Sequence, residues 1–272
     1  MKANSNLHRI LLATLLAGIA LTVPAQDTLR PRKVITNAQM VAAGAVNQLD
    51  TYLSPEEYTG SEVRYVSQSV RENGTRLSRE LIHQARLAYT HNRADNNNEI
   101  GGGYNFQYNV HWKAGSWQVG NGLLSVKVGA GVDANVGFLY NTRNSNNPAQ
   151  AYLSLNLAPS AVVGYRFRLW NRPFQLRYAV QAPLAGLMFS PNYGQSYYEI
   201  FSEGNYDHNI VPTTFTTTPS LRQLLSLDLT LRHTTLRLGY LGDFQQSKAN
   251  HLKAHTWSNL LVVGIVRTFS IN

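Results

Sequence analysis

Long stretches of the chain alternate between apolar and polar residues. Every even-numbered residue from Leu124 to Tyr140 is apolar or aromatic, whereas the odd-numbered residues from Ser125 to Gly137 are Ser, Lys, Asp, Asn or Gly. Alternation with a period of two predicts a β-strand with two different faces. Strands of soluble sheets are usually ~5–6 residues long, whereas a tilted strand that crosses a bilayer needs ~9–11. The length of this segment therefore favours a membrane-crossing strand.

Six further segments alternate in the same way: residues 104–112, 153–169, 174–180, 225–231, 236–244 and 261–271. Three earlier segments, residues 38–50, 61–71 and 76–91, do so more weakly, and the first also has helical spacing through Val41, Ala45 and Leu49. Beyond residue 25 no stretch approaches the ~18 consecutive apolar residues of a membrane helix. The pattern predicts an all-β fold, an antiparallel up-and-down transmembrane β-barrel.

The connectors between these segments alternate in length. Short ones are expected at residues 72–74, 113–116, 171–173 and 233–234, and long polar ones at residues 92–99, 142–150, 183–220 and 245–254. Outer-membrane barrels have short periplasmic turns, longer extracellular loops and an even strand number. We therefore expect residues 35–50 to form a first strand, followed by a loop over residues 50–60. This gives about ten strands, or twelve if a hairpin near residues 195–201 lies within the longest loop.

The N-terminus has the features of a signal peptide. Lys2 and Arg9 precede the apolar run Ile10–Val23, and small residues precede Gln26, as a signal-peptidase site requires. An uncleaved anchor is the alternative. We expect a signal peptide over residues 1–25, an extension over 26–34 and the barrel over 35–272. Because the chain has no Cys, disulfides, thiolate metal sites and a lipid-modified N-terminal Cys are excluded.

Composition supports a barrel with a polar interior. Only 14% of residues are charged, against about a quarter in typical soluble proteins, although the formal net charge is +9. Alternation places many charged residues on the inward face: Glu80, Arg86, Lys127, Asp133, Arg166, Arg168, Arg177, Arg222, Asp228, Arg232, Arg237 and Asp243. Charges confined in a narrow lumen should pair, and surplus arginines should face water near the ends. We expect a polar, ionic plug, with a small anion-preferring pore as the alternative.

Candidate chemical sites are weak, and the sequence assigns no catalytic, cofactor-binding or metal-binding residue. Asp207 and His208 lie in the longest loop, where an omptin-type protease would carry an Asp–His pair. His255 and Ser258 are three residues apart, so on a strand they point to opposite faces. A hydrolase acting on lipid or peptide through Asp207, His208 or His255 is nevertheless an alternative function.

Other motifs add no chemistry. The histidines His83, His91 and His111 lack metal-ligand spacing. Gly101, Gly102 and Gly103 open a strand and not a phosphate-binding helix. Basic residues are dispersed over inward faces and do not form a patch, which excludes nucleic acid as a partner.

One segment carries a family resemblance. Residues 47–55 (NQLDTYLSP), followed by Glu57, Tyr58, Thr59 and Gly60, resemble the N-terminal signature of an uncharacterised outer-membrane barrel family of Bacteroidota. The resemblance implies a fold and a location and carries over no catalytic residue. The usual terminal aromatic is absent, so recognition by the barrel-assembly machinery would use Phe269 and Ile271.

These features predict a monomeric protein of the Gram-negative outer membrane, without cofactor and without enzymatic activity. Its role would be structural, or surface binding through extracellular loops to a ligand that the sequence does not identify. Outer-membrane lipids and lipopolysaccharide are the expected lipid partners, the latter attracted by the surplus positive charge.

Overall fold

The computed structural model describes residues 33–231 and 234–271, which consist mainly of β-strands. The strands are β1 (Lys33–Asp50), β2 (Ser54–Glu72), β3 (Leu77–Asn92), β4 (Asn98–Val119), β5 (Gly122–Asn141), β6 (Ala149–Leu169), β7 (Arg172–Gln181), β8 (Ala185–Phe189), β9 (Ile210–Thr214), β10 (Leu221–Thr230), β11 (Thr235–Ala249) and β12 (Leu252–Ile271). A short helix, α2 (Tyr197–Phe201), lies in the longest connector. The expected signal peptide and most of the expected extension lie outside the described residues, so that division of the chain stays a prediction.

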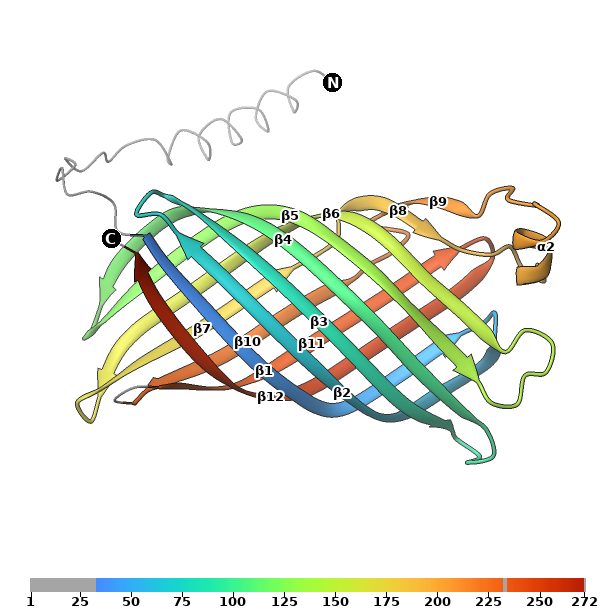
Figure 1. Cartoon of the computed structure of the whole chain (residues 1–272), viewed down its shortest axis with the longest axis horizontal. Coiled ribbons are helices and arrows are strands. Elements are labelled where there is room, and N and C mark those ends of the chain that lie inside the picture. The colour runs from blue at the N-terminus through green and yellow to red at the C-terminus, as the bar shows by residue number, and fades with distance from the viewer. Residues whose placement is uncertain (1–32, 232–233, 272) are drawn as a thin grey trace, which may run out of the picture. The chain divides into compact units, whose positions relative to one another are not determined.

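The strands close into a ring (Figure 1). Successive long strands pair antiparallel, and β1 pairs with β12 from Lys33–Ile271 to Asp50–Ala254. Strands β7 and β8 pair with successive parts of β6, and β9 and β10 follow them as the next neighbours. Strands β7 and β8 therefore share one position in the ring, and β9 and β10 share the next. The twelve strands of the described residues thus fill ten positions. The predicted antiparallel barrel of about ten strands is confirmed.

The interruption between β7 and β8 lies at Pro183, which has no backbone N–H to donate to a neighbour. Its flanking residues keep the register, because the N–H groups of Ala182 and Leu184 donate to the carbonyls of Pro159 and Leu157 at 3.2 and 2.9 Å. The β8–β9 hairpin thus prolongs the wall beyond β7 and β10. Residues 195–201, where a hidden hairpin was the alternative, instead contain α2.

Several strands extend further than the sequence predicts. The turn expected at residues 113–116 is wrong, since β4 continues to Val119 with a bulge between Lys113 and Gly115. The loop expected at residues 50–60 is a turn of residues 51–53, and that expected at 245–254 is a two-residue turn at Asn250 and His251, both with positive φ. The polar segments stay in the sheet because their backbone groups pair with one adjacent strand, β1 in the first case and β12 in the second.

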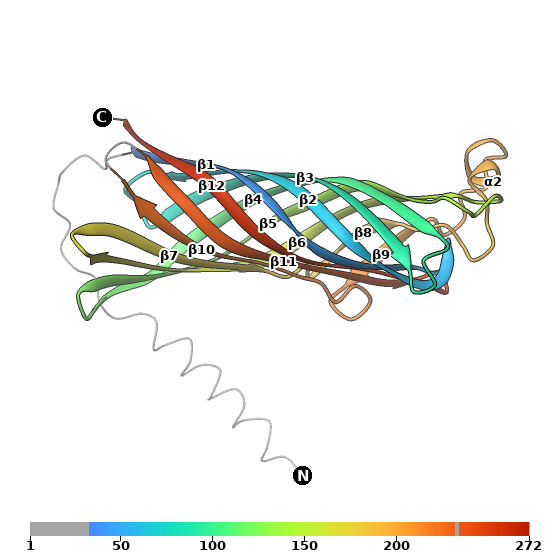
Figure 2. The ribbon, with the colours of Figure 1, turned by 90° about the horizontal axis from the view of Figure 1, so that it is seen from below.

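The outward face carries the apolar residues of the alternating pattern. Leu87, Leu157 and Leu261 are 64–70% exposed, as expected for side chains that face lipid. Aromatic pairs lie near both ends of the barrel: Phe167 stacks on Phe174 with ring centroids 5.5 Å apart, and Phe244 lies opposite Trp257. No described helix is long and apolar enough to cross a membrane. Figure 2 shows the tilted strands from a second direction.

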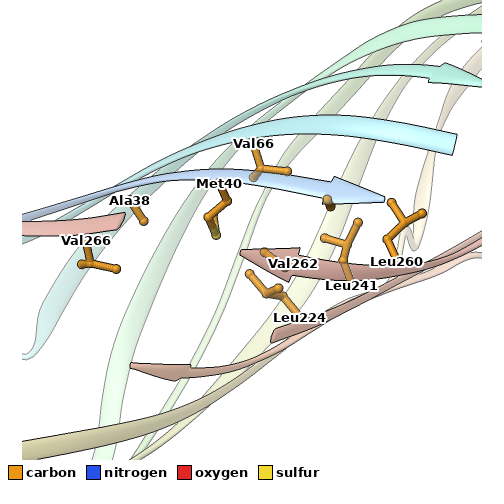
Figure 3. Close-up of a cluster of buried hydrophobic side chains, with 9 residues drawn as sticks. Ala38, Met40, Val66, Leu224, Leu241, Leu260, Val262 and Val266 are labelled. Carbon is orange, nitrogen blue, oxygen red and sulfur yellow. The ribbon is translucent and has the colours of Figure 1, made fainter. Parts of the chain in front are cut away.

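The lumen contains an apolar cluster that the sequence pattern did not predict. Its members come from β1, β2, β10, β11 and β12: Ala38, Met40, Ala42, Val66, Leu224, Leu241, Leu260, Val262 and Val266, with Ile82 of β3 packed against them (Figure 3). They alternate with outward-facing neighbours such as Val41 and Leu261. The expectation of a purely polar and ionic plug is therefore only partly correct.

Candidate functional site

A chain of ion pairs crosses the lumen toward the end with the longer loops. Arg64 of β2 contacts Glu62 and reaches Asp243 of β11, each at 2.6 Å. Asp243 also accepts from Arg222 of β10 at 3.1 Å, and Arg222 reaches Asp133 of β5 at 3.0 Å. The five side chains are at most 8% exposed. We call this chain the septum.

Neutral groups complete the septum. Arg64 donates to Gln84 at 3.0 Å, and Ser258 donates to Glu62 at 2.7 Å. Arg86 lies above them and contacts Glu62 at 3.3 Å. Polar groups confined away from water need such partners, because an unsatisfied one costs about 1–3 kcal/mol.

A second layer lies nearer the end with the short turns. Arg177 of β7 reaches across to Glu80 of β3 at 2.7 Å. Asp228 of β10 pairs with its cross-strand neighbour Arg237 through two hydrogen bonds of 2.6 and 2.7 Å. Arg237 also donates to Gln68 at 2.6 Å, which ties the pair to β2.

The buried ion pairs contain equal numbers of the two charges. In the part of the lumen that the structure describes, five arginines (Arg64, Arg86, Arg177, Arg222 and Arg237) meet five acids (Glu62, Glu80, Asp133, Asp228 and Asp243). Two further acids, Asp50 and Glu99, are buried near the long loops and belong to no ion pair between described residues. The expected pairing is confirmed. Arg166 and Arg168 lie exposed near the end of β6, as expected of surplus arginines, and Arg232 lies outside the described residues.

Sequence reasoning missed Glu62 and Arg64, the centre of the septum. The alternation of residues 61–71 is weak, so these two residues were not recognised as inward-facing. The apolar residues Val63 and Tyr65 were a usable signal, because residues that alternate with them must face the lumen. Both of these are about half exposed, which places Glu62 and Arg64 inward at 1% and 2% exposure.

A cavity of about 170 Å³ lies above the septum, toward the longer loops. Arg64, Arg86 and Arg222 form part of its lining, together with Tyr152 and Phe189. The cross-strand pair Gly103 and Gly137 also lines the cavity. A Cβ on Gly137 would lie 2.7 Å from the Gly102 carbonyl oxygen, so a larger residue at that position would require the backbone to shift.

The longest connector is fastened to the rim of the barrel. Tyr52 donates to the Gln195 carbonyl at 2.8 Å, and Asn250 donates to the Ser190 and His208 carbonyls at 3.0 and 2.9 Å. The Tyr197 hydroxyl donates to Gln150 at 2.8 Å and accepts from the Ala151 N–H at 2.6 Å. Burial raises the pKa of Tyr197 to about 12, so its hydroxyl keeps the proton that it donates.

Helix α2 begins in a capping box. Ser196 accepts from the Glu199 N–H at 3.2 Å, and the Glu199 carboxylate accepts from the Ser196 N–H at 2.6 Å. These hydrogen bonds to the charged form lower the pKa of Glu199 below its usual value. Phe201 stacks on Tyr197, and Phe189 lies against both rings. The connector is therefore a folded unit.

This unit presents aromatic side chains to solvent. Tyr193, Tyr198, Phe201 and Tyr206 are 62–75% exposed. We call these four residues the aromatic tip. Aromatic residues are enriched at protein interfaces because they bring a large contact area at a small loss of conformational entropy.

The residues of the hydrolase alternative do not assemble. Asp207 and His208 contact each other at 2.7 Å, but both side chains are 78% exposed. His255 stacks on Trp257 and bonds to Asn47, whereas Ser258 points into the septum. The expected opposite orientation of His255 and Ser258 is confirmed.

The remaining histidines also lie apart. His83 and His91 lie at outward positions of β3, and His111 lies inside against Glu80 and Ser160. Among the described residues no group of three or more His, Cys, Asp or Glu side chains could hold a metal ion.

The unbalanced charge is concentrated at the two ends. Outside the buried pairs, the described short-turn end carries one acid, Glu72, and ten cations: Lys33, Arg71, Arg76, Arg79, Lys113, Lys127, Arg166, Arg168, Arg172 and Arg267. The described long-loop end carries four cations (Arg93, Arg143, Lys248 and Lys253) and eight acids (Asp50, Glu56, Glu57, Asp95, Glu99, Glu199, Glu203 and Asp207). The barrel is thus basic at one end and acidic at the other.

Comparisons with known proteins give a family and a fold. The model of the family described as "Protein of unknown function (DUF3316)" matches residues 8–271. The chain belongs to this family. No curated protein matches it.

Solved structures with similar folds are barrels of the outer membrane. The outer membrane protease OmpT from Escherichia coli matches with a TM-score of 0.46 and 6% identity, over 91% of this chain and 100% of that one. Neisserial surface protein A matches with a TM-score of 0.33 and 11% identity, over 86% of this chain and 97% of that one. The COG4313 outer membrane channel from Pseudomonas putida F1 matches with a TM-score of 0.35 and 10% identity, over 91% of this chain and 100% of that one.

Proposed function

We propose that this member of the DUF3316 family is a non-enzymatic surface-binding protein of the outer membrane that engages an extracellular ligand through its aromatic tip. The observation that carries the proposal is the fastening of residues 190–209 to the rim, which fixes the segment that carries the four exposed aromatic residues. A binding loop that is folded before it meets its ligand loses less conformational entropy on binding. The ligand would be one recognised by stacking and apolar contact with these rings.

The septum supports a closed lumen as part of this proposal. An anion-preferring pore needs a lumen with unpaired positive charge, whereas each of the five arginines that reach into the described lumen contacts an acid. Arg64 and Arg222 also contact carboxylates directly. If either side chain moved aside to open a passage, buried acids would lose their partners.

The enzyme alternative has less support. Asp207 and His208 form a pair that could act as a general base, as an omptin-type mechanism would require. The 78% exposure of both side chains to water weakens such a pair, because catalytic electrostatics depend on a site of low dielectric. We therefore place Asp207 and His208 on the binding surface.

Outer-membrane location rests on the outward apolar band and its aromatic ends. In this proposal the long-loop end faces the outside of the cell and the short-turn end the periplasm. Lipopolysaccharide would contact the part of the apolar band near the long loops. The surplus positive charge would not attract it, because that charge lies at the short-turn end. Phe269 and Ile271 of β12 would be recognised by the barrel-assembly machinery.

Binding through the aromatic tip is tested with purified protein in nanodiscs. The wild type would be screened against immobilised extracellular glycoproteins and polysaccharides, and every ligand found would be tested on a variant with Tyr193, Tyr198, Phe201 and Tyr206 changed to Ser. We expect affinity to fall at least about tenfold, because aromatic anchors commonly contribute more than 1 kcal/mol each. The matched control is Trp170→Ser, an 83% exposed aromatic in a short turn, which should bind like the wild type.

Two results would overturn the proposal. One is ligand binding that the four-residue variant retains in full. The other is hydrolysis of a lipid or peptide by the wild type that Asp207→Asn abolishes, which would establish the enzyme alternative.

A further inference from the structure

One sector of the outward face interrupts the apolar band near the short-turn end. On the adjacent strands β3, β2, β1 and β12, the register places Arg79 opposite Arg71, and Arg71 opposite Ile35. The next outward row is Leu81, Ser69, Asn37 and Arg267. The row above it contains His83, Ser67, Gln39 and Ile265. Polar groups thus occupy three successive rows of a face that should be apolar if it met only lipid chains.

The rest of the ring does not repeat this feature. Near the same end the outward residues are Val110 and Trp112 on β4, Val126 and Val128 on β5, Phe167 on β6, Phe174 and Leu176 on β7, Leu227 and Leu229 on β10, and Leu236 and Leu238 on β11. The sector is therefore specific to one side of the barrel. We call Arg71, Arg79, Arg267, Ser69 and Asn37 the basic sector.

The three arginines of the basic sector have no anionic partner among the residues that the structure describes. All three are exposed, and no ion pair between described residues includes them. The acids next to Arg71 and Arg79 in the chain, Glu72 and Glu80, face the other way and pair with Lys127 and Arg177. Like charges directly opposite on neighbouring strands, as Arg71 and Arg79 are, destabilise a sheet. An arrangement of this kind becomes favourable when an anion lies between the guanidinium groups.

The depth of the arginines matches the headgroup layer of a bilayer. Arg71 is the second residue from the end of β2, and Arg79 is the third residue of β3. The polar layer on each side of the hydrocarbon core is about 5–7 Å thick. Ser69 and Asn37 lie two residues deeper than Arg71 and Ile35, or about 5 Å along the membrane normal for a tilted strand. That is the depth of the glycerol esters of a phospholipid whose phosphate lies at the arginines.

We propose that the basic sector binds one anionic phospholipid of the leaflet that surrounds the short-turn end. Arg71 and Arg79 contact its phosphate, since guanidinium groups bind phosphate oxygens in a bidentate manner. Arg267 lies opposite Asn37 in the next row, and its long side chain extends from there to the same phosphate. Asn37 and Ser69 donate to its ester carbonyls. The inference depends on the proposed placement of the barrel in a membrane and not on the ligand of the aromatic tip.

The test uses the full mature chain folded in detergent micelles and analysed by native mass spectrometry. Phosphatidylglycerol, phosphatidylcholine and inorganic phosphate would be titrated separately at equal phosphorus concentration. The variant replaces Arg71, Arg79 and Arg267 with Gln. The matched control replaces Arg166 and Arg168 with Gln, because these exposed arginines lie at the same end but on the lumen-facing register of β6.

The wild type and the control should each retain one phosphatidylglycerol molecule in preference to phosphatidylcholine, and neither should retain phosphate. The variant should bind phosphatidylglycerol about a hundredfold more weakly, because each basic residue near an anionic surface contributes about fivefold. A heat-dependent gel shift shows that each protein is folded.

Equal retention of phosphatidylglycerol by the variant and the wild type would overturn the proposal, as would equal retention of phosphatidylcholine by the wild type. A site that binds phosphate alone would mean a small-anion site. Crosslinking of the basic sector to a second protein, without retained lipid, would mean a protein interface. A chain that folds in detergent but fails to enter bilayers would refute the proposed location and would be distinguishable from any of these results.

Discussion

The pair Asp228 and Arg237 allows a sharp test of how buried charge contributes to this barrel. The two residues lie directly opposite on β10 and β11, are 6% and 3% exposed, and share two short hydrogen bonds. In Asp228→Leu the guanidinium keeps only Gln68 as an oxygen acceptor. Removing one partner of a buried pair leaves an uncompensated charge, so the free energy of unfolding should fall by ~3–5 kcal/mol. Arg237→Leu should have a similar effect.

The double variant Asp228→Leu with Arg237→Leu should recover most of this loss. Arg237 lies 3.8 Å from the sulfur of Met40, a member of the apolar cluster. Two leucines would therefore extend an existing apolar surface, and replacing a buried ion pair by apolar residues of similar volume is often close to neutral. The coupling free energy is the sum of the two single losses minus the loss of the double variant, so it should exceed the loss of either single variant, ~3–5 kcal/mol.

The measurement is urea-induced unfolding from phospholipid vesicles, followed by tryptophan fluorescence and by gel mobility of the folded form. Asn146→Ala in the exposed loop of residues 142–148 is the control, with an expected change within about 0.5 kcal/mol. Asp133→Leu should lose less stability than Asp228→Leu, because Arg222 keeps Asp243 at 3.1 Å. A double variant no more stable than the weaker single variant would refute the reasoning, as would equal stability of Asp228→Leu and Asn146→Ala.

Three further predictions concern orientation, the loop and the lumen. Single Cys residues at Asn146, Tyr193 or Lys248 should react with a membrane-impermeant maleimide on intact cells, and Cys at Asn73, Arg172 or Thr234 should not; the opposite result would invert the barrel. Tyr197→Phe removes the hydroxyl that bonds Gln150 and Ala151, so protease should cleave residues 190–209 faster while the global unfolding midpoint stays the same. The control is Tyr198→Phe, because the Tyr198 ring is exposed. Equal cleavage rates for the two variants would show that the Tyr197 hydroxyl is not needed to anchor the loop. Wild-type protein in planar bilayers should show no stable conductance steps, because the septum crosses the lumen, and steps that depend on anion identity would restore the pore alternative.

The period-two pattern determined which side of each strand faces outward and which faces the lumen. This holds for β5, where Val128 and Val136 face outward and Asp133 inward, and for β12, where His255 and Ser258 diverge. A strand turns its side chains to alternate faces by its local geometry alone. The sequence therefore sufficed for the fold class, for most of the inward charges and for the prediction that they would pair.

Strand ends and the broken strands needed the tertiary structure. Residues 245–249 are polar and were expected to be loop, yet they pair with β12 because the partner strand is present beside them. The β8–β9 hairpin likewise forms because Leu155 and Asn156 of β6 offer a free edge above β7. Hydrogen bonding to a neighbour can keep a segment in a sheet whatever its local pattern.

The partners inside the lumen also depend on closure. Arg64 and Asp243 are separated by 179 residues and meet only because β1 and β12 join the two ends of the sheet. The same closure gathers Met40, Leu241 and Val262 into one apolar cluster within a face that the sequence predicted to be polar. Alternation states which face a side chain occupies, but the opposite wall that it meets is decided by how many strands complete the ring and by their stagger.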